Sequence, residues 1–436
     1  TAIKGVGRAK AAGLVAAFTF RIAQPYAFTG SNLFDFQLAR EFLDAINQQR
    51  QIQEGTYDWP PGIQWAGTTP YLFPLKNIVL WGLGPALGVT GVLALAGASW
   101  RLWRRRDWAL FLPVVWVLLN FAYFGGLVLK TMRYYQPTYP MLALLAAWLL
   151  LKAWDGWGRS GRARALRVAL FAVVIGGTAL WALAFTGIYS RPVSRLAASE
   201  WIHNTIPDGT PVATEHWDDA LPLALPGFGG AGRYELLQLP LYDDDTPQKR
   251  ERVLDIVTRA EYIILSSNRL SDSIPRMPRR FPMTIRYYEA LFSGELGFAE
   301  IAEFTSRPSL AGFEFVDDSA EEAFTVYDHP RVRIFQKTAE FDANTARTIL
   351  NEVDISGAIR LLPRDAAPPE LLLSAADREN LPTTGALPEQ LFGNSTFAGF
   401  PAVAWYALVL LAGLAAWPLV ALALGRLPDG GYFAAR

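Results

Sequence analysis

Long apolar stretches constrain this chain more than any other feature of its sequence. Four of them carry few or no charged residues and reach about 20 residues, the length that a helix needs to cross the hydrocarbon core of a bilayer. Unpaired backbone groups are costly in hydrocarbon, so such stretches are expected to be transmembrane helices. The sequence therefore predicts a polytopic α-helical membrane protein. The four predicted spans are Ile78–Trp100, Ala109–Leu129, Val168–Tyr189 and Phe400–Leu424.

Two further stretches complete the predicted membrane region. Tyr134–Leu151 qualifies as a fifth span when its proline-containing start is placed at the membrane interface. Ala11–Phe28 is a weaker sixth candidate because it carries Arg21 and Pro25. The 15 Trp, 26 Phe and 16 Tyr suit such a protein, since aromatic rings gather at membrane interfaces.

Basic residues in the short connecting loops predict the orientation of these helices. Lys and Arg cluster before the first candidate span, in RLWRRRD and in KAWDGWGRSGRARALR, and alternating traversal places all three clusters on one side. By the positive-inside rule that side is the cytoplasm. The loop 21–77, the turn Lys130–Thr138 and the polar region 190–398 then lie outside. We therefore expect a multi-pass protein of the plasma membrane with residues 190–398 on its external side.

The composition excludes several classes of function. The chain holds 40 basic and 40 acidic residues, so it lacks the basic surface that binding of nucleic acid requires. It has no cysteine, which excludes disulfides, thiolate metal sites and cysteine nucleophiles. Its three histidines are scattered without an HExxH spacing. Neither a metal site nor another cofactor is indicated.

The region 190–337 predicts an external α/β domain inserted before the last transmembrane helix. Predicted helices over Ser194–Ile206, 246–259 and Phe281–Gly294 alternate with short apolar strands, a pattern typical of a mostly parallel sheet. No glycine-rich phosphate loop follows a strand, which disfavours a nucleotide site. The predicted strands cover Pro211–Thr214, Glu261–Ser267, Ala299–Ser306 and Arg331–Lys337.

The rest of the chain divides around this domain. Residues 1–189 form the membrane region with its external loop 21–77, in which Leu33–Gln49 has the apolar spacing of an amphipathic helix. The proline-containing region 338–398 predicts a loosely structured external linker. Residues 399–436 are expected to form the last transmembrane helix and a cytoplasmic end.

The segment KTMRYYQPTYP holds the residues best suited to chemistry at the membrane. Lys130 and Arg133 lie where one predicted span ends and the next begins, and a cation at such a place faces protein, a cavity or a lipid phosphate. Tyr134 and Tyr135 add hydroxyl donors beside them. Snorkelling cations in an interfacial aromatic belt explain the same spacing, so the residues alone leave both interpretations open.

Acidic residues provide a second set of candidates. EHWDDALPL follows a predicted strand and offers His216, Asp218 and Asp219 for binding a sugar or an acceptor, although a helix start capped by Asp accounts for the same residues. Asp58 lies in a loop rich in Trp and Pro beside the membrane. Its carboxylate is suited either to meeting a sugar or to forming a turn.

A series of motifs, taken in order, resembles one family. RYYQPTYP leading into LALLAAW resembles a segment of bacterial GT-C glycosyltransferases of the family 39 type, the relatives of protein O-mannosyltransferases and aminoarabinose transferases. The motifs RIAQPYAF, DWPPGIQWA, YLFPLKNIVLWGLG, EHWDDALPL, YIILSSNR and FTVYDHPRVRIFQK are similar to one branch of that group. The resemblance runs from about Gly13 to Lys337, and RLPDGGYFAAR resembles the junction before a second membrane module, the YYY-motif family.

The resemblance implies transfer of a sugar from a polyprenyl-phosphate donor to an acceptor on the external face. It implies that Lys130 and Arg133, with Tyr134 and Tyr135, bind the lipid phosphate, where fixed cations stabilise the charge that develops on the leaving group. The family's catalytic acidic residue is expected upstream of Thr1, so this chain would be the C-terminal part of such an enzyme. The alternatives are a non-catalytic scaffold or subunit of a larger membrane complex, and a lipid-binding transporter.

Overall fold

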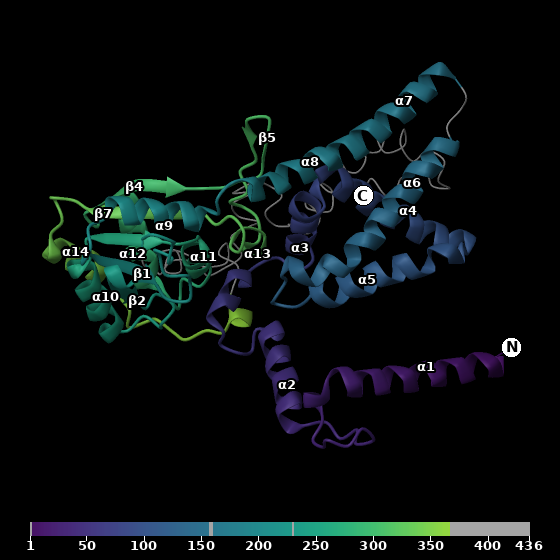
Figure 1. The fold of residues 1–436 in the computed structure, drawn as a ribbon, viewed down its shortest axis with the longest axis horizontal. Coiled ribbons are helices and arrows are strands. Elements are labelled where there is room, and N and C mark those ends of the chain that lie inside the picture. Colours follow the sequence, from purple (N-terminus) through teal and green to yellow (C-terminus); the bar gives the residue numbers. More distant parts are fainter. Residues whose placement is uncertain (1, 157–159, 229–230, 367–436) are drawn as a thin grey trace, which may run out of the picture. The chain divides into compact units, whose positions relative to one another are not determined.

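A computed structural model describes residues 2–156, 160–228 and 231–366 of the chain. In these residues a series of helices is followed by an α/β domain (Figure 1). The predicted last span Phe400–Leu424 and the resemblance to a module junction fall outside the described residues. The helices before the α/β domain are α1 (Ala2–Ala23), α2 (Arg40–Glu54), α3 (Leu72–Asn77), α4 (Gly84–Arg105), α5 (Phe111–Gly125), α6 (Tyr139–Gly156), α7 (Gly161–Phe171) and α8 (Gly177–Thr186).

Three helical stretches in the described part of the chain are long and apolar enough to cross a membrane. They are Gly84–Arg105, Trp108–Gly125 and Gly161–Thr205, and each overlaps a predicted span. The predicted spans over Ala11–Phe28 and Tyr134–Leu151 are helical in α1 and α6, but neither helix is among these three. Arg21 in α1 and Lys152 in α6 lower the apolar character of these two helices.

The membrane-type helices pack through small and branched side chains and leave large apolar ones outside. Ala94 and Ala98 of α4 are fully buried against Leu145 of α6. Gly84 begins α4 with a φ of 74°, and a Cβ there would lie 2.4 Å from the Trp181 ring of α8, so only glycine fits. Leu93, Leu112, Leu119, Leu180 and Leu183 point outward and are more than half exposed, as expected for a surface that faces lipid.

The amphipathic helix of the first loop begins later than its sequence predicts. The prediction was Leu33–Gln49, whereas α2 begins at Arg40 and ends at Glu54. Arg21 is buried and donates hydrogen bonds to the backbone oxygens of Gly30, Asn32 and Asp35 at 2.6, 2.8 and 2.9 Å. These carbonyls point at one guanidinium and therefore cannot continue a helical ladder.

The predicted α/β domain is present, but its sheet is mixed rather than mostly parallel. The strand order is β2-β1-β3-β7-β4, with β1 parallel to β2 and β3, and β7 antiparallel to β3 and β4. Between β4 and β7 the chain forms only a hairpin and a helix of four residues, α13, and no helix that could return it for a parallel pairing. The strands of the sheet are β1 (Pro211–Glu215), β2 (Glu235–Leu239), β3 (Tyr262–Leu265), β4 (Phe298–Phe304) and β7 (Val332–Lys337).

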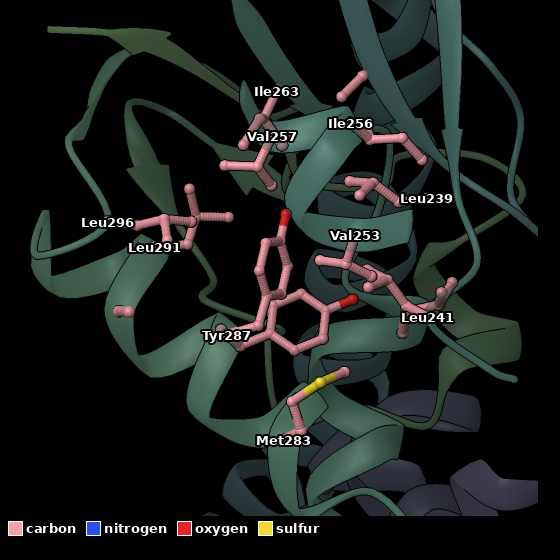
Figure 2. Close-up of a cluster of buried hydrophobic side chains, with 14 of the residues drawn as sticks. Leu239, Leu241, Val253, Ile256, Val257, Ile263, Met283, Tyr287, Leu291 and Leu296 are labelled. Carbon is pink, nitrogen blue, oxygen red and sulfur yellow. The ribbon is translucent and has the colours of Figure 1, made fainter. Parts of the chain in front are cut away.

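Helices cover both faces of this sheet because buried side chains alternate along the strands. Val212, Ile264 and Ile334 pack with α9 in one cluster, while Ile263 and Phe335 belong to the cluster on the opposite face. Figure 2 shows part of this second cluster, with side chains of α10 and α12 packed together. The helices of the domain are α9 (Ser194–Thr205), α10 (Pro247–Arg259), α11 (Arg269–Ser273), α12 (Pro282–Ser293), α13 (Glu322–Thr325) and α14 (Ala343–Asn351).

The ordered domain continues beyond its predicted end at Lys337. The sequence predicts a loosely structured linker over 338–398, but α14 begins at Ala343, where the Asp342 side chain accepts a hydrogen bond from the Thr345 amide at 2.8 Å. Ile349 and Leu350 of α14 are buried in the core of the domain. One amphipathic face is enough to dock this helix, because it completes an existing apolar layer. Residues 367–398 of the predicted linker are outside the described part.

Candidate functional site

Three segments that the sequence predicts on one side of the membrane contact one another. The Met132 amide, between α5 and α6, donates to Oε2 of Glu321 at 3.1 Å. The Glu321 amide donates to Oδ1 of Asn77 at 2.8 Å, and Arg280 of the α/β domain pairs with Asp58 of the first loop at 2.9 Å. The loop 21–77, the turn Lys130–Thr138 and the α/β domain are therefore in direct contact with one another.

A cavity of about 490 Å³ lies where these segments meet, and we call it the aromatic cavity. Its walls combine flat aromatic rings with planar polar groups that can donate and accept hydrogen bonds. This combination is typical of a binding site for a small polar ligand with an apolar face. The lining includes Trp59, Trp65, Trp217, Tyr134 and Tyr327 among aromatic residues, and Gln49, Gln64, Arg133, Arg269, Glu321 and Glu322 among polar ones.

A second cavity of about 560 Å³ opens between the membrane-type helices, and we call it the helix groove. Its lining is largely apolar and comes from the start of α4, from α8, from the segment that leads into α6, and from Ala323, Phe324 and Asp328 of the α/β domain. A third, almost wholly apolar cavity of about 510 Å³ shares Leu87, Thr178 and Ala182 with the groove. The apolar surface therefore continues from the groove between α6 and α8.

Arg133 lines both the aromatic cavity and the helix groove. The guanidinium lies 5.5 Å from the centre of the Tyr327 ring. The side chain is exposed, and no carboxylate in the described residues lies within 4 Å of it. A free guanidinium at this junction is available to an anionic ligand.

Lys130 is placed differently from Arg133. It is buried, and its Nζ donates to Oγ1 of Thr68 at 3.1 Å and to the Val128 carbonyl at 3.2 Å. Burial lowers the pKa of Lys130 to about 8. It lines neither the aromatic cavity nor the helix groove. The ammonium therefore neither faces open solvent nor pairs with a carboxylate in the described residues.

The two neighbouring tyrosines also differ. Tyr134 lines the aromatic cavity, and its hydroxyl accepts a hydrogen bond from the Gln49 side chain of α2 at 3.1 Å. Tyr135 is fully buried and packs against Phe121 and Phe124 of α5. In this structure Tyr135 is thus a core residue, out of reach of a ligand in either cavity.

The predicted residues of EHWDDALPL are held by the α/β domain. His216 accepts a hydrogen bond from the Tyr242 amide at 2.6 Å, and burial lowers its pKa to about 4. Arg195 pairs with Asp218 and Asp219, at 2.9 Å in each case. None of these three side chains lines the aromatic cavity: His216 and Asp218 are bonded within the domain, and Asp219 is exposed to solvent. The cavity residue of this motif is Trp217.

Trp217 was not singled out by the sequence, although it stands in the middle of this motif. Its φ of 63° lies in the left-handed region, which is rare for a bulky residue. Arg269 donates to its carbonyl at 2.8 Å and supports this conformation. The ring is 49 % exposed and lines the aromatic cavity. Strained backbone of this kind concentrates at binding sites.

Asp58 lies outside both cavities and joins the first loop to the α/β domain. Its carboxylate accepts hydrogen bonds from Arg280 at 2.9 and 3.0 Å and from Arg360 at 2.6 and 2.9 Å. Burial alone would raise the pKa of Asp58, but the two guanidinium groups outweigh it and hold that pKa below its ordinary value. With four such bonds the carboxylate has little capacity left for a sugar.

Glu321 and Glu322 are cavity residues that the sequence did not reveal. Glu321 is 3 % exposed, and its Oε1 has no hydrogen-bond partner in the described residues. Burial raises its pKa to about 7, the range suited to exchanging protons with a ligand. Glu322 pairs with Arg269 at 2.6 Å. The only signal in the sequence is an acidic pair one residue before FTVYDHPRVRIFQK, one of the motifs that carry the family resemblance.

The arrangement has three chemical parts that adjoin: rings and planar polar groups, a free guanidinium, and an apolar channel between helices. Together they suit an amphiphilic ligand with a polar ring, an anionic group and a long apolar chain. No protein-family model, curated protein or solved structure matches the chain, so its family is not shown by comparison and the geometry of the two cavities is what supports a function.

Proposed function

We propose that this chain is the C-terminal part of a polytopic membrane glycosyltransferase of the GT-C type. In this proposal it transfers a sugar from a polyprenyl-phosphate donor to an acceptor on the external face of the plasma membrane. The family resemblance of the motifs suggests the reaction, and the cavities support it because they suit the three parts of such a donor.

The observation that carries the proposal is the place of Arg133 between the two cavities. In a polyprenyl-phosphate sugar, the phosphate lies between the sugar ring and the isoprenoid chain. A guanidinium shared by an aromatic cavity and an apolar groove is suited to the same order of groups. Arg can grip two phosphate oxygens at once, which fixes the donor as well as attracting it.

The apolar surface beyond Arg133 is suited to the isoprenoid chain. Trp181 and Phe185 of α8 line the helix groove, and Leu87 belongs to both the groove and the apolar cavity that follows it. Burying each methylene of a lipid chain there contributes about 0.8 kcal/mol. The three helices that are long and apolar enough to cross a membrane support the placement of this channel in the bilayer.

The aromatic cavity is suited to the sugar and the acceptor. In the proposed reaction an acceptor hydroxyl oxygen bonds to the anomeric carbon while the bond from that carbon to the phosphate oxygen breaks. The hydroxyl proton passes to the acidic residue that the resemblance assigns upstream of Thr1, and the polyprenyl phosphate leaves with one more negative charge. Arg133 stabilises that charge as it develops. Glu321 and Glu322 accept hydrogen bonds from sugar hydroxyls in this proposal.

Binding of undecaprenyl phosphate tests the proposal without knowledge of the sugar. The full-length protein and its Arg133→Ala variant are titrated with this lipid in detergent micelles, with quenching of tryptophan fluorescence as the readout. A hydrogen bond to a charged group contributes about 1.5–3 kcal/mol, so the variant should bind about 10- to 100-fold more weakly.

Arg279→Ala is the matched control, because Arg279 is an exposed arginine of the α/β domain that lines neither cavity. Its affinity for the lipid should equal that of the wild type. Equal affinity of the Arg133→Ala variant would overturn the proposal. Absence of lipid binding by the wild type would favour the scaffold alternative.

A further inference from the structure

A short hairpin of the α/β domain carries apolar side chains that stay exposed in the described part of the protein. It consists of β5 (Ser309–Leu310) and β6 (Phe313–Glu314), joined by Ala311 and Gly312. Phe313 is 76 % exposed, and Phe315 and Val316, which follow it, are 42 and 61 % exposed. Exposed apolar residues in one contiguous segment mark an interaction surface.

The hairpin packs against one of the helices that are long enough to cross a membrane. The rings of Phe315 and Trp181 of α8 meet edge to face with their centres 5.6 Å apart. A Cβ on Gly187, just after α8, would lie 3.1 Å from the Ser309 carbonyl, so the hairpin and the helix end are in close contact. Figure 1 shows the hairpin labelled β5 beside the end of the α8 ribbon that lies away from α7.

The end of α8 sets the level of the hairpin. Ser309 contacts Gly187, two residues before Tyr189, where the predicted span ends, and Phe315 contacts Trp181 farther along α8. Leu180 and Leu183, on either side of Trp181, are more than half exposed and belong to the outward apolar surface of α8. The apolar face of the hairpin therefore continues a surface that is suited to lipid.

The charged residues around the hairpin are compatible with a position at the membrane surface. Glu314 is the one charged residue in Ser309–Val316, and it lies 3.9 Å from Arg191, which follows the span. The acidic residues directly after the hairpin have partners within the domain: an Asp317 oxygen lies 2.7 Å from Nε2 of His329, and Asp318 pairs with Arg307 at 3.1 Å. No free carboxylate of this segment opposes contact with a membrane.

We propose that Ser309–Val316 is a membrane-inserted hairpin, with Phe313, Phe315 and Val316 among the lipids of the leaflet that faces the α/β domain. Its outer strand edges carry unpaired backbone groups, which hydrocarbon does not tolerate, so the hairpin lies at headgroup depth rather than in the bilayer centre. Aromatic rings are favoured at that depth. The hairpin thus anchors the α/β domain beside the mouth of the helix groove, which α8 also lines.

The absence of cysteine makes a direct test possible, because a single introduced cysteine is a unique labelling site. Phe313→Cys and Val316→Cys variants of the full chain are labelled with an environment-sensitive nitrobenzoxadiazole dye and reconstituted into phosphatidylcholine–phosphatidylglycerol vesicles. Leu180→Cys on α8 is the membrane reference. Asn344→Cys, on the exposed face of α14, is the aqueous reference.

Both hairpin labels should be quenched by lipids that carry a nitroxide, more by a shallow nitroxide than by a deep one. Iodide in the aqueous phase should quench them several-fold less than the Asn344→Cys label. Iodide quenching equal to that reference would overturn the proposal. So would a label shielded from iodide but unaffected by nitroxide lipids, which would show that protein covers the hairpin. Phe313 and Val316 are exposed, so these substitutions leave the fold intact.

Discussion

The backbone amide of Met132 donates a hydrogen bond to Oε2 of Glu321 at 3.1 Å, across 189 positions of the chain. Met132 precedes Arg133, the residue shared by the two cavities, and Glu321 lines the aromatic cavity. One hydrogen bond therefore fixes a buried carboxyl group of the α/β domain beside the segment that carries the free guanidinium. This relationship makes the cavity a joint product of both parts of the protein.

Glu321 should make the stability of the protein depend on pH. Burial raises its pKa from 4.5 to about 7, so the folded protein holds this proton more tightly than the unfolded chain does. The contribution of this bound proton to the free energy of unfolding is fully present below about pH 4.5. It is lost as the pH rises through about 7, a change of ~3 kcal/mol.

Melting temperatures of the wild type and the Glu321→Gln variant, compared between pH 5 and 8, measure this loss of stability. The wild type should lose stability relative to the variant as the pH rises. Burial also raises the pKa of Glu215 to about 8. Glu215 is present in both proteins, so its effect on stability cancels in the comparison. Parallel curves would contradict the prediction.

Lys130 and Arg133 should contribute unequally to lipid binding. Arg133 lines both cavities, whereas Lys130 lines neither and uses its Nζ on Thr68 and Val128. Lys130→Met keeps an unbranched side chain, one atom shorter, and removes the charge. It should change the affinity for undecaprenyl phosphate by less than about 3-fold, the effect of a distant and partly screened charge. The same fluorescence titration measures this. A loss as large as that of Arg133→Ala would show that Lys130 reorients to meet the phosphate.

Removal of the Asp58 carboxylate should destabilise the protein rather than remove a sugar contact. Arg280 is 4 % exposed and loses two charged hydrogen bonds in Asp58→Ala, although Asp244 still pairs with it at 2.7 Å. We expect the free energy of unfolding to fall by about 1–3 kcal/mol. Arg360→Ala is the control, because that side chain is 67 % exposed and its ion pair should contribute less than about 1 kcal/mol. Denaturant titration separates the two. Unchanged stability of Asp58→Ala would favour the sugar-binding interpretation.

Truncation of the buried face of α14 should show that the α/β domain extends past Lys337. Leu350 is fully buried in the main core cluster, so Leu350→Ala should lower the free energy of unfolding by about 2–5 kcal/mol. Thr348, two positions earlier and exposed, provides the control: Thr348→Ala should change stability by no more than about 0.5 kcal/mol. Similar melting curves for the two variants would mean that α14 contributes nothing to the domain.

Periodic apolar patterns account for what the sequence predicted well. The spans over Ile78–Trp100, Ala109–Leu129 and Val168–Tyr189 each overlap a helix long and apolar enough to cross a membrane. The predicted helices of the α/β domain agree with α9, α10 and α12 to within one or two residues. In both cases every turn of the helix needs apolar residues for burial or for contact with lipid, so the apolar pattern repeats along the sequence. The predicted start of α2 was wrong because Arg21 binds the carbonyls of Asn32 and Asp35 and because Leu38 forms an isolated β-bridge with Phe28.

The sequence by itself determined which stretches are apolar enough for a membrane, where the α/β domain begins, and that Lys130 and Arg133 lie close together along the chain. Only the tertiary structure decided that Arg133 lines the cavities while Lys130 is buried. It also decided that Asp58 forms an ion pair with Arg280 and that Glu321 lines the aromatic cavity. Composition and periodicity report how a residue meets solvent or lipid on average. The direction and partners of one polar side chain depend on groups tens to hundreds of positions away, and no local pattern records them.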